Sequence, residues 1–478
     1  MRKRKTLHRA YLTDVNLEDV ITRHIEIATR PKVRCEWVDD GKVDDRWGVS
    51  VCNFTEIIEK EGKKPPRRAV LLKKYKFLIH DIIMRCRASK NNSVQLNYAR
   101  YVTVLGKHFR EMLFTLDDLG IIALSTTYTM GESSRRVSLN DWNFDFVEDG
   151  NIEVMKYAEK LRLTYLETVK EYTSSRENSS FIKQYNKCIS KLELIDSDGA
   201  LEYIESRKTS FTTRHSYYYY RSRIEDFNKN ELMVTSIDRN GRIYHYLTNL
   251  PKSLKRFFNI GWQLDIANSH PVLFSYYLIK EYNINNDILK FFLNLNYSDI
   301  IEYHNKGKQL RKLLRDNNIE VQDARSLPND VLLYIFVTMK GRFWDDFVEV
   351  FKTMDRGEVK STLFKEVFYS HSTTTRNKEY AKQFAHTYPN VWHTIRVMKK
   401  QSKGNLANKM MAFESKLFAS ILKRCFERGW CVVSIHDAIE VLNVQENEHL
   451  DIDELKGIMM EEYAKVGLFP TVSIDVFR

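Results

Sequence analysis

Two aspartates that are far apart in the chain each stand at the end of an apolar run. Asp265 lies in the segment Trp262–Pro271, and Asp437 lies in the segment Cys431–Val441. Both runs have the character of buried strands. If the strands pair side by side, the two carboxylates come together, and such a pair can hold two divalent ions about 3.5–4 Å apart for phosphoryl transfer. The pattern therefore predicts a two-metal site.

A second set of functional residue types recurs every four positions. Two cations are followed by two aromatic residues, namely Arg356, Lys360, Phe364 and Phe368. At this spacing all four share one face of a helix. The cations suit a triphosphate, and the rings suit a sugar and a base. A plain amphipathic helix is the alternative, because Lys and Arg stems can also lie over apolar surface.

The residues around each aspartate predict how it is positioned. Asn268–Ser269 is typical of a helix start and Pro271 of a first helical turn, so Asp265 is expected beside a helix N-terminus that favours phosphate. His436 and Asp437 form a tight turn between two strands, where a desolvated carboxylate needs a cation. His-Asp pairs also occur in metal-dependent phosphohydrolases, but the apolar strand before His436 disfavours that alternative.

A hairpin is expected ahead of the first aspartate. Asn240-Gly241 is a strong turn signal within Asp238–Tyr244, and Arg242 follows it directly. From the edge of a sheet, Arg242 would reach a phosphate of a primer or template. This signal is weaker than the others, because such hairpins are common.

The elements that must position these residues form an interrupted domain. Strand-like pieces occur in 231–300 and 404–478, and the stretch between them is helical and charged. This order predicts one sheet with a helical insertion between its halves.

Residues 1–150 look separate from the rest of the chain. A helix, a strand, a polar turn and a second strand are expected from Lys107 to Leu139, which resembles the second half of a winged helix. Arg135 and Arg136 at the turn would contact a DNA backbone. A protein-docking module is the alternative.

Composition favours a polyanionic partner. The chain has 478 residues, with 75 Lys and Arg against 63 Asp and Glu, for a net charge of +12. Neutralisation of phosphates drives much of nucleic-acid affinity, although many basic soluble proteins bind none. The six cysteines include no Cys-x-x-Cys pair, which argues against a zinc ribbon and favours a reducing, cytoplasmic setting. No apolar run is long enough to cross a bilayer, so no membrane partner is expected.

Taken in order, the motifs resemble those of superfamily A polymerases, the group of bacterial repair DNA polymerases and single-subunit phage RNA polymerases. The order is Gly-Arg, then Asp on a strand, then Arg-x3-Lys-x7-Phe-Tyr on a helix, then His-Asp on a hairpin, within residues 235–478. Asn268–Pro271 resembles the transposon-virus polymerase branch of mobile elements and viruses. The resemblance implies a helix-rich α+β fold shaped as a right hand, with an antiparallel palm sheet and helical fingers and thumb.

The local patterns and the resemblance together divide the chain into five segments. The pattern of residues 1–150, which have no counterpart in the family, predicts an N-terminal accessory domain with a helical or winged-helix-like fold. The others are a thumb-like helical region (151–234), the first part of the palm (235–300), helical fingers (301–403) and the second part of the palm with its His-Asp hairpin (404–478).

Residue roles follow from the same resemblance. Asp265 and Asp437, helped by the Ile266 carbonyl, would bind two Mg²⁺ ions, for which Mn²⁺ can substitute. The remaining expected site residues divide by ligand: Arg356, Lys360, Phe364, Phe368 and His270 for the nucleoside triphosphate, and Arg242 and His436 for primer and template DNA. Lys360 would also donate a proton to the leaving pyrophosphate. A replicative helicase is a further expected partner.

Three departures from the family pattern leave the choice of sugar open. Ala438 stands where many of the DNA polymerases have Glu, and Phe368-Tyr369 stands where Tyr-Gly is usual. His270 occupies the neighbourhood of the group that screens the ribose 2′-position. The sequence therefore predicts a 5′-3′ DNA polymerase of a mobile or viral genome, with a primase or DNA-dependent RNA polymerase as a close second.

Two alternatives belong to other classes. One is a non-catalytic DNA-binding replication protein on a polymerase fold, which retention of both aspartates and Lys360 disfavours. The other is a DNA-nicking initiator that uses a tyrosine of the run 217–220. No His-x-His motif is present to supply the metal site that such enzymes commonly need.

Overall fold

A computed structural model gives the arrangement of the chain. It describes residues 8–29, 32–44, 49–60, 67–89, 92–125, 136–140, 144–148, 152–208, 214–296, 327–352, 354–370, 372–376, 378–402 and 406–477. The chain divides into two compact units, of which the first comprises residues 1–167 and 196–227 and the second comprises 168–195 and 228–478.

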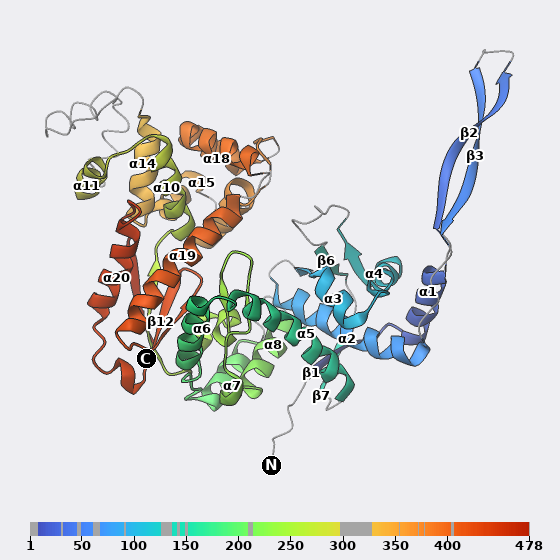
Figure 1. Ribbon diagram of the computed structural model, residues 1–478, viewed down its shortest axis with the longest axis horizontal. Coiled ribbons are helices and arrows are strands. Elements are labelled where there is room, and N and C mark those ends of the chain that lie inside the picture. Colours follow the sequence, from blue (N-terminus) through green and yellow to red (C-terminus); the bar gives the residue numbers. More distant parts are fainter. Residues whose placement is uncertain are drawn as a thin grey trace. The chain divides into compact units, whose positions relative to one another are not determined.

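The first unit combines helices with small antiparallel sheets (Figure 1). Its elements are β1 (His8–Leu12), α1 (Leu17–Thr29), β2 (Lys32–Asp44), β3 (Val49–Lys60), α2 (Arg68–Ala88), β4 (Ser93–Gln95), α3 (Tyr98–Leu105), α4 (Phe109–Asp118), β5 (Ile122–Leu124), β6 (Arg136–Leu139), β7 (Phe144–Glu148), most of α5 (Ile152–Tyr172), α7 (Ser197–Ser206) and α8 (Arg214–Glu225). The strands pair as β1 with β7, β2 with β3, and β4-β6-β5.

An apolar core holds the central part of this unit together. Helices α2, α3 and α4 and the sheet β4-β6-β5 contribute buried aliphatic and aromatic side chains, among them Leu78, Ile82, Tyr101, Phe109 and Val137. The start of α3 is set by its N-cap, since the Asn97 side chain accepts a hydrogen bond from the Arg100 N–H at 3.3 Å. Helix, strand, two helices and two strands thus follow one another around a single core.

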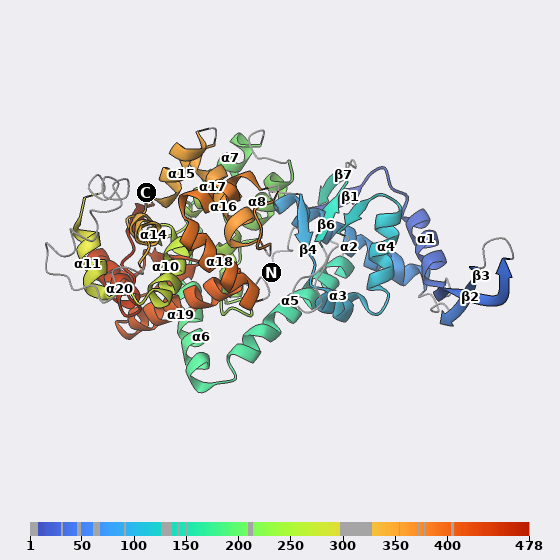
Figure 2. The ribbon, with the colours of Figure 1, turned by 90° about the horizontal axis from the view of Figure 1, so that it is seen from above.

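The second unit contains a four-stranded antiparallel sheet and many helices (Figures 1 and 2). Its elements are α6 (Arg176–Ile189), η1 (Lys229–Glu231), β8 (Ser236–Ile237), β9 (Ile243–Tyr244), η2 (Tyr246–Asn249), α9 (Lys252–Lys255), β10 (Ile260–Ile266), α10 (Ser269–Glu281), α11 (Asn286–Asn294), α14 (Asn329–Met339), α15 (Phe343–Phe351), α16 (Arg356–Leu363), η3 (Phe364–Phe368), α17 (Glu379–Thr387), α18 (Pro389–Gln401), α19 (Leu406–Glu427), β11 (Val432–Ile435), β12 (Ala438–Leu442), η4 (Gln445–Asn447), α20 (Ile452–Ala464) and β13 (Val472–Val476).

The sheet of the second unit joins segments that are far apart in the sequence. Its strand order is β11-β12-β10-β13, and every neighbouring pair is antiparallel. Strands β11 and β12 are buried along their whole length, which explains their mostly apolar and β-branched sequence. The exceptions are Ser434 and Glu440, and Glu440 is paired with Lys255. Pairing of β10 with β12 brings the chain near residue 265 beside the chain near residue 438.

Two local features shape the helical part around this sheet. Helix α16 begins with a capping box, in which Asp355 accepts from the Glu358 N–H at 2.9 Å and Glu358 accepts from the Asp355 N–H at 3.1 Å. The turn between α14 and α15 requires glycine at position 341. Its φ is +76°, and a Cβ there would lie 3.2 Å from the Cβ of Ala267.

The prediction of a helix-rich α+β protein with antiparallel sheets is confirmed. The expected thumb-like region 151–234 is shared between the two units, because residues 168–195 belong to the second unit and 196–227 to the first. Residues 297–326, most of the start of the expected fingers, lie outside the described part of the chain. None of the helices described combines the length and apolar character needed to cross a membrane.

Candidate active site

Asp265 and Asp437 lie side by side, as the strand pattern predicts. Asp265 stands near the end of β10 opposite Ala438 of β12, the residue directly after Asp437. The Ile266 N–H donates to the Asp437 carbonyl at 3.1 Å, which fixes the two backbones together. Asp437 lies in the two-residue turn between β11 and β12, and both aspartates are half-buried. The register of the sheet therefore places the two acidic residues next to each other.

Both aspartates line a cavity of about 400 Å³ within the second unit. Acidic, basic and aromatic side chains share its wall. The lining residues are Arg242, Asp265, Ile266, Ala267, Asn268, Ser269, His270, Trp344, Arg356, Lys360, Phe364, Tyr369, Glu414, His436, Asp437 and Ser473. They come from the sheet, from α10, α15, α16 and α19, and from the β9 hairpin. The cavity thus gathers most of the residues that the sequence singled out.

Among the residues that the structure describes, no Lys or Arg forms an ion pair with either carboxylate, although the charges of Lys360 and, at Asp265, of Lys252 oppose their protonation. Burial, and then the charge of Asp437, raise the pKa of Asp265 to about 7. Burial, and then the charge of Glu414, raise the pKa of Asp437 as well. The charge of Lys360, which lines the same cavity, opposes the shift at both aspartates. Because two half-buried carboxylates repel each other, a bound cation would stabilise their charged forms strongly.

The donor set fits a hard divalent ion such as Mg²⁺. Mg²⁺ prefers carboxylate oxygens and is commonly held by only one or two protein carboxylates, with substrate phosphates and water completing its shell. Across the described residues, no cluster of three or more His, Cys, Asp or Glu is arranged around a metal position. Asp265 and Asp437, with the backbone of Ile266 between them in the cavity wall, are the groups that would hold such an ion.

The two expected triphosphate ligands lie on the same short helix. Arg356 and Lys360 are exposed on α16 and line the cavity. Arg356 pairs through Nε with Asp345 at 3.0 Å, a surface ion pair that an anionic ligand can readily replace. The Lys360 ammonium lies 5.9 Å from the centre of the Phe364 ring. A cation and a ring thus stand next to each other, opposite the two aspartates.

The aromatic part of this surface differs from the expected one. The segment Phe364–Phe368 is a π-helical turn, in which the Tyr369 N–H donates to the Phe364 carbonyl at 2.7 Å, five residues back. Tyr369 therefore comes to lie over Phe364, with ring centres 4.8 Å apart and planes only 14° from parallel. Spacing by four assumes a regular α-helix, and the wider turn moves the next ring by one position.

Phe368 consequently packs into the core and does not line the cavity. It is fully buried, and its ring contacts Phe274, Phe343 and Phe384 at centre-to-centre distances of 6.3, 6.3 and 6.0 Å. Tyr369 takes the place in the cavity wall that the sequence assigns to Phe368. Phe364 lines the cavity as expected, and its ring lies 5.2 Å from that of Trp344.

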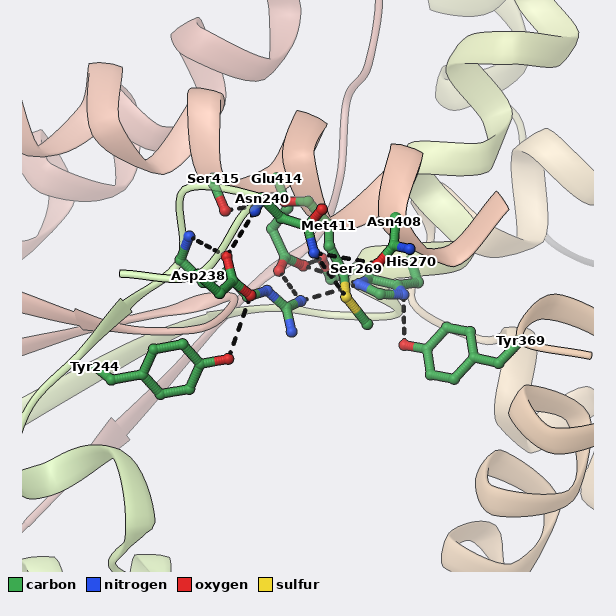
Figure 3. Close-up of polar contacts among 11 residues, drawn as sticks. Asp238, Asn240, Tyr244, Ser269, His270, Tyr369, Asn408, Met411, Glu414 and Ser415 are labelled. Carbon is green, nitrogen blue, oxygen red and sulfur yellow. Dashed lines mark hydrogen bonds and ion pairs between the residues drawn. The ribbon is translucent and has the colours of Figure 1, made fainter. Parts of the chain in front are cut away.

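A buried polar network occupies one side of the cavity (Figure 3). Glu414 of α19 accepts a hydrogen bond from the Ser269 hydroxyl at 2.7 Å and an ion pair from Arg242. Arg242 also donates to His270 Nε2 at 3.2 Å. On its other side, His270 Nδ1 shares a hydrogen bond of 2.7 Å with the Tyr369 hydroxyl. The network thus connects the hairpin of Arg242 with α10, α19 and the π-helical turn.

This network changes the interpretation of Arg242. The sequence predicts a contact with primer or template, whereas the guanidinium is only 15% exposed and faces Glu414, which is 1% exposed. Burial alone would raise the pKa of Glu414, but His270, Arg242 and the Ser269 hydroxyl together lower it to about 2. Arg242 is therefore the counter-ion of a buried glutamate, and its exposed remainder forms part of the cavity wall.

His436 occupies the tip of the β11–β12 turn. Its φ of +56° is in the left-handed region, which a tight two-residue hairpin turn needs at this position. The residue is exposed, lines the cavity and lies 6.2 Å from the ring of Tyr244. Of the two arginines expected at a DNA-binding turn, Arg135 lies outside the described residues. Arg136 is exposed on β6 and donates to Ser93 Oγ at 3.1 Å.

Sequence reasoning missed Glu414, Tyr369 and Trp344. Glu414 carried a readable signal, because it stands on the buried stripe of α19 with Met410, Leu417 and Ile421. A charged residue on such a stripe must have partners, which predicts a functional or structural network. Tyr369 was hidden by the π-helical turn, for which the local sequence gives no clear signal.

Comparisons with known proteins give little further guidance. No protein-family model and no curated protein matches the chain. Among solved structures, a match is found to the POL domain of Pol1 from M. smegmatis in complex with DNA primer-template and dNTP. The TM-score is 0.24 and the identity 10%, over 66% of this chain and 65% of that one. The chain thus spans just under two thirds of that protein's length, and a likeness this slight carries no argument.

Proposed function

We propose that the protein is a template-directed nucleotidyltransferase that extends a DNA strand by two-metal phosphoryl transfer. The observation that carries the proposal is the pair of unneutralised aspartates, Asp265 and Asp437, facing Arg356 and Lys360 across one cavity. Carboxylates for metal ions and cations for a triphosphate are the two parts that this chemistry needs. The motif order of superfamily A polymerases supports the same function.

The chain's own groups would act as follows. Arg356 and Lys360 bind the triphosphate, and Lys360, which lines the cavity with both aspartates, would donate a proton to the leaving pyrophosphate. Asp265 and Asp437 hold the divalent ions, which when bound lower the pKa of the attacking hydroxyl and neutralise the phosphates. Phe364 and Tyr369 form an aromatic wall on which a base or sugar stacks.

His270 and Tyr369 are the groups best placed to choose between sugars. Their shared hydrogen bond holds both side chains at the cavity wall beside the aspartates. Side chains held in fixed positions at the wall can exclude or admit one sugar hydroxyl by steric fit, and a polar group that the wrong sugar leaves unpaired adds to the discrimination. DNA synthesis is our first proposal, and RNA synthesis or priming by the same site is the second.

The wider setting belongs to the same proposal. Palm, fingers and thumb would correspond to the sheet of the second unit, to α14–α18 and to helices of 151–234. The order of elements in the first unit supports a winged-helix-like accessory domain with DNA contacts near Arg136. The segment Asn268–Pro271 supports a role in copying a mobile or viral genome in the cytoplasm, where a replicative helicase would be a partner.

The alternative of a DNA-nicking tyrosine finds less support. In α8, the Tyr217 hydroxyl donates to Glu205 and accepts from Arg221 at 2.7 Å, and the side chain is buried. A tyrosine held in this way is a structural residue. Tyr219 and Tyr220 are half-buried and pack against each other with ring centres 5.3 Å apart.

Primer extension tests the proposal. The purified protein is given a labelled primer on a template, Mg²⁺, and either deoxy- or ribonucleotides, beside a reaction without primer. Template-dependent extension with deoxynucleotides is the expected result. Dinucleotides made without primer would move the function to a primase or RNA polymerase, and no incorporation of either nucleotide would overturn it.

A further inference from the structure

A buried lysine lies behind the segment that carries Tyr369. Lys399, on α18, is only 1% exposed. Its ammonium donates to the Val367 carbonyl and to the Ser372 carbonyl, the latter at 3.4 Å. In the described part of the chain, no carboxylate pairs with it. The two carbonyls bracket Tyr369 in the sequence, so one side chain grips the backbone on both sides of a cavity residue.

Such a lysine is an unusual choice for a core position. Burial, and then the charge of Lys378, lower the pKa of Lys399 to about 7. An apolar side chain of similar length would avoid the desolvation that this shift reflects. A buried amine that is kept here, with backbone carbonyls as its hydrogen-bond acceptors, indicates that the position of those carbonyls matters.

The backbone that Lys399 contacts includes the end of the π-helical turn Phe364–Phe368. The π-helical turn ends with the hydrogen bond from the Tyr369 N–H to the Phe364 carbonyl, and this wide turn is the reason that Tyr369, not Phe368, faces the cavity. A regular α-helical turn would bring Phe368 into register instead. Lys378 adds a second restraint, since its ammonium donates to the Ser370 hydroxyl. Two lysines from the following segment thus hold the backbone at Val367 and Ser372 and the side chain of Ser370 in place.

We propose that Lys399 is a positioning residue, which holds Tyr369 against His270 and Phe364 and thereby sets the affinity of the cavity for its nucleotide. Lys399 does not line the cavity, so it acts through Tyr369. This inference rests on the proposed function, because the ligand whose affinity changes is the nucleoside triphosphate. Lys399 would thus influence nucleotide affinity although it lies outside the sequence motifs described above.

The test compares Lys399→Met with Lys400→Met. Methionine keeps the length and apolar stem of residue 399 but removes its donors, whereas Lys400 is an exposed neighbour on the same helix. We expect Lys399→Met to raise the nucleotide KM about tenfold, as loss of a buried hydrogen bond implies, with kcat changed much less. Lys400→Met should leave both constants near those of the unaltered protein. An unchanged KM in Lys399→Met would overturn the inference.

A double-mutant cycle with Tyr369→Phe shows whether Lys399 acts through Tyr369. If it does, adding Tyr369→Phe to Lys399→Met raises KM much less than Tyr369→Phe does alone. Independent, multiplying effects would contradict the inference. Should Lys399→Met fail to fold, Lys399→Gln, which retains one donor group, replaces it in the same cycle.

Hydrogen exchange separates failure of this inference from failure of the proposed function. Amides of 367–372 should exchange faster in Lys399→Met than in Lys400→Met, while the amides of β10 and β12 stay protected. This readout needs no catalysis. If no nucleotide is incorporated by the unaltered protein, the function is wrong, yet the exchange result still decides the role of Lys399. Equal exchange of 367–372 in both variants would overturn that role.

Discussion

Two groups of acidic residues in the same cavity differ in whether the protein itself stabilises their negative charge. Glu414 is surrounded by donors from Arg242 and Ser269, and the pKa of its carboxyl falls to about 2. Asp265 and Asp437 face each other, and the pKa of Asp265 rises to about 7. The first acid is satisfied inside the protein and holds structure together. Asp265 and Asp437 have no such partners within the described protein, and we therefore propose that they are the reactive part of the site.

The largest effect should come from the unsatisfied pair. Asp437→Asn removes a proposed metal ligand without removing a buried partner, so incorporation should fall about a thousandfold or more, which corresponds to several kcal/mol of lost transition-state stabilisation. Folding should be unaffected, as judged by circular dichroism. The control is Asp475→Asn, an acid of the same sheet that pairs with Lys252. Equal activity of the two variants would remove the distinction drawn between the two regions.

Substitution of Glu414, the acid with partners inside the protein, should lower stability, in contrast to substitution of Asp437, which should lower activity. Glu414→Ala leaves Arg242 buried without its counter-ion, so the free energy of unfolding should fall by about 3–5 kcal/mol. Denaturant titration measures this change. Glu414→Gln, which keeps the shape and one acceptor, should lose less. If Glu414→Ala were as stable as the unaltered protein, the network would not be the structural element described here.

The dependence of stability on pH and Mg²⁺ sharpens the contrast. Without divalent ions, native Asp265 holds a proton up to about pH 7, whereas an unfolded chain with a pKa near 3.8 has already released it. The native state then binds more protons, so stability from this group falls as the pH rises from about 4 to about 7.

A bound cation should restore that stability only where the carboxylates are charged. We expect Mg²⁺ to raise the melting temperature by a few degrees at pH 8 and hardly at all at pH 5, measured by differential scanning fluorimetry. Asp265→Asn should abolish the dependence on Mg²⁺. A shift of equal size at both pH values would assign the ion to another place.

The smallest effect concerns the link between the two regions. Tyr369→Phe removes the hydroxyl that bonds His270 but keeps the ring that stacks on Phe364. Loss of one such hydrogen bond is worth about 0.5–1.5 kcal/mol, so the nucleotide KM should rise roughly two- to tenfold. Steady-state kinetics with both nucleotide types measures it. A change in KM as large as that measured in parallel for Lys360→Met would mean that Tyr369 binds the triphosphate itself.

The sequence predicted the parts of the site that regular structure controls. Pairing of the strands around Asp265 and Asp437 follows from apolar β-type runs, whose period and burial leave few other arrangements. Placement of Arg356, Lys360 and Phe364 followed in the same way from helical spacing. The positions of these residues could be predicted from the periodicity of a strand or a helix alone.

The irregular backbone and the buried polar network could not be predicted from the sequence. Spacing by four cannot anticipate the π-helical turn, so the positions of Phe368 and Tyr369 were exchanged relative to the cavity. Arg242 was assigned to an external phosphate, because nothing near it in sequence reveals Glu414, which lies on a distant helix. Partners that are far apart in the chain become visible only when the fold brings them together.

Binding of Mn²⁺, followed by electron paramagnetic resonance in the presence of a nucleoside triphosphate, tests the central claim most directly. We expect two ions for each chain at pH 8, reduced binding in Asp265→Asn and in Asp437→Asn, and unchanged binding in Asp475→Asn. Binding of Mn²⁺ that is the same in all four proteins would contradict the assignment of Asp265 and Asp437 as the ligands.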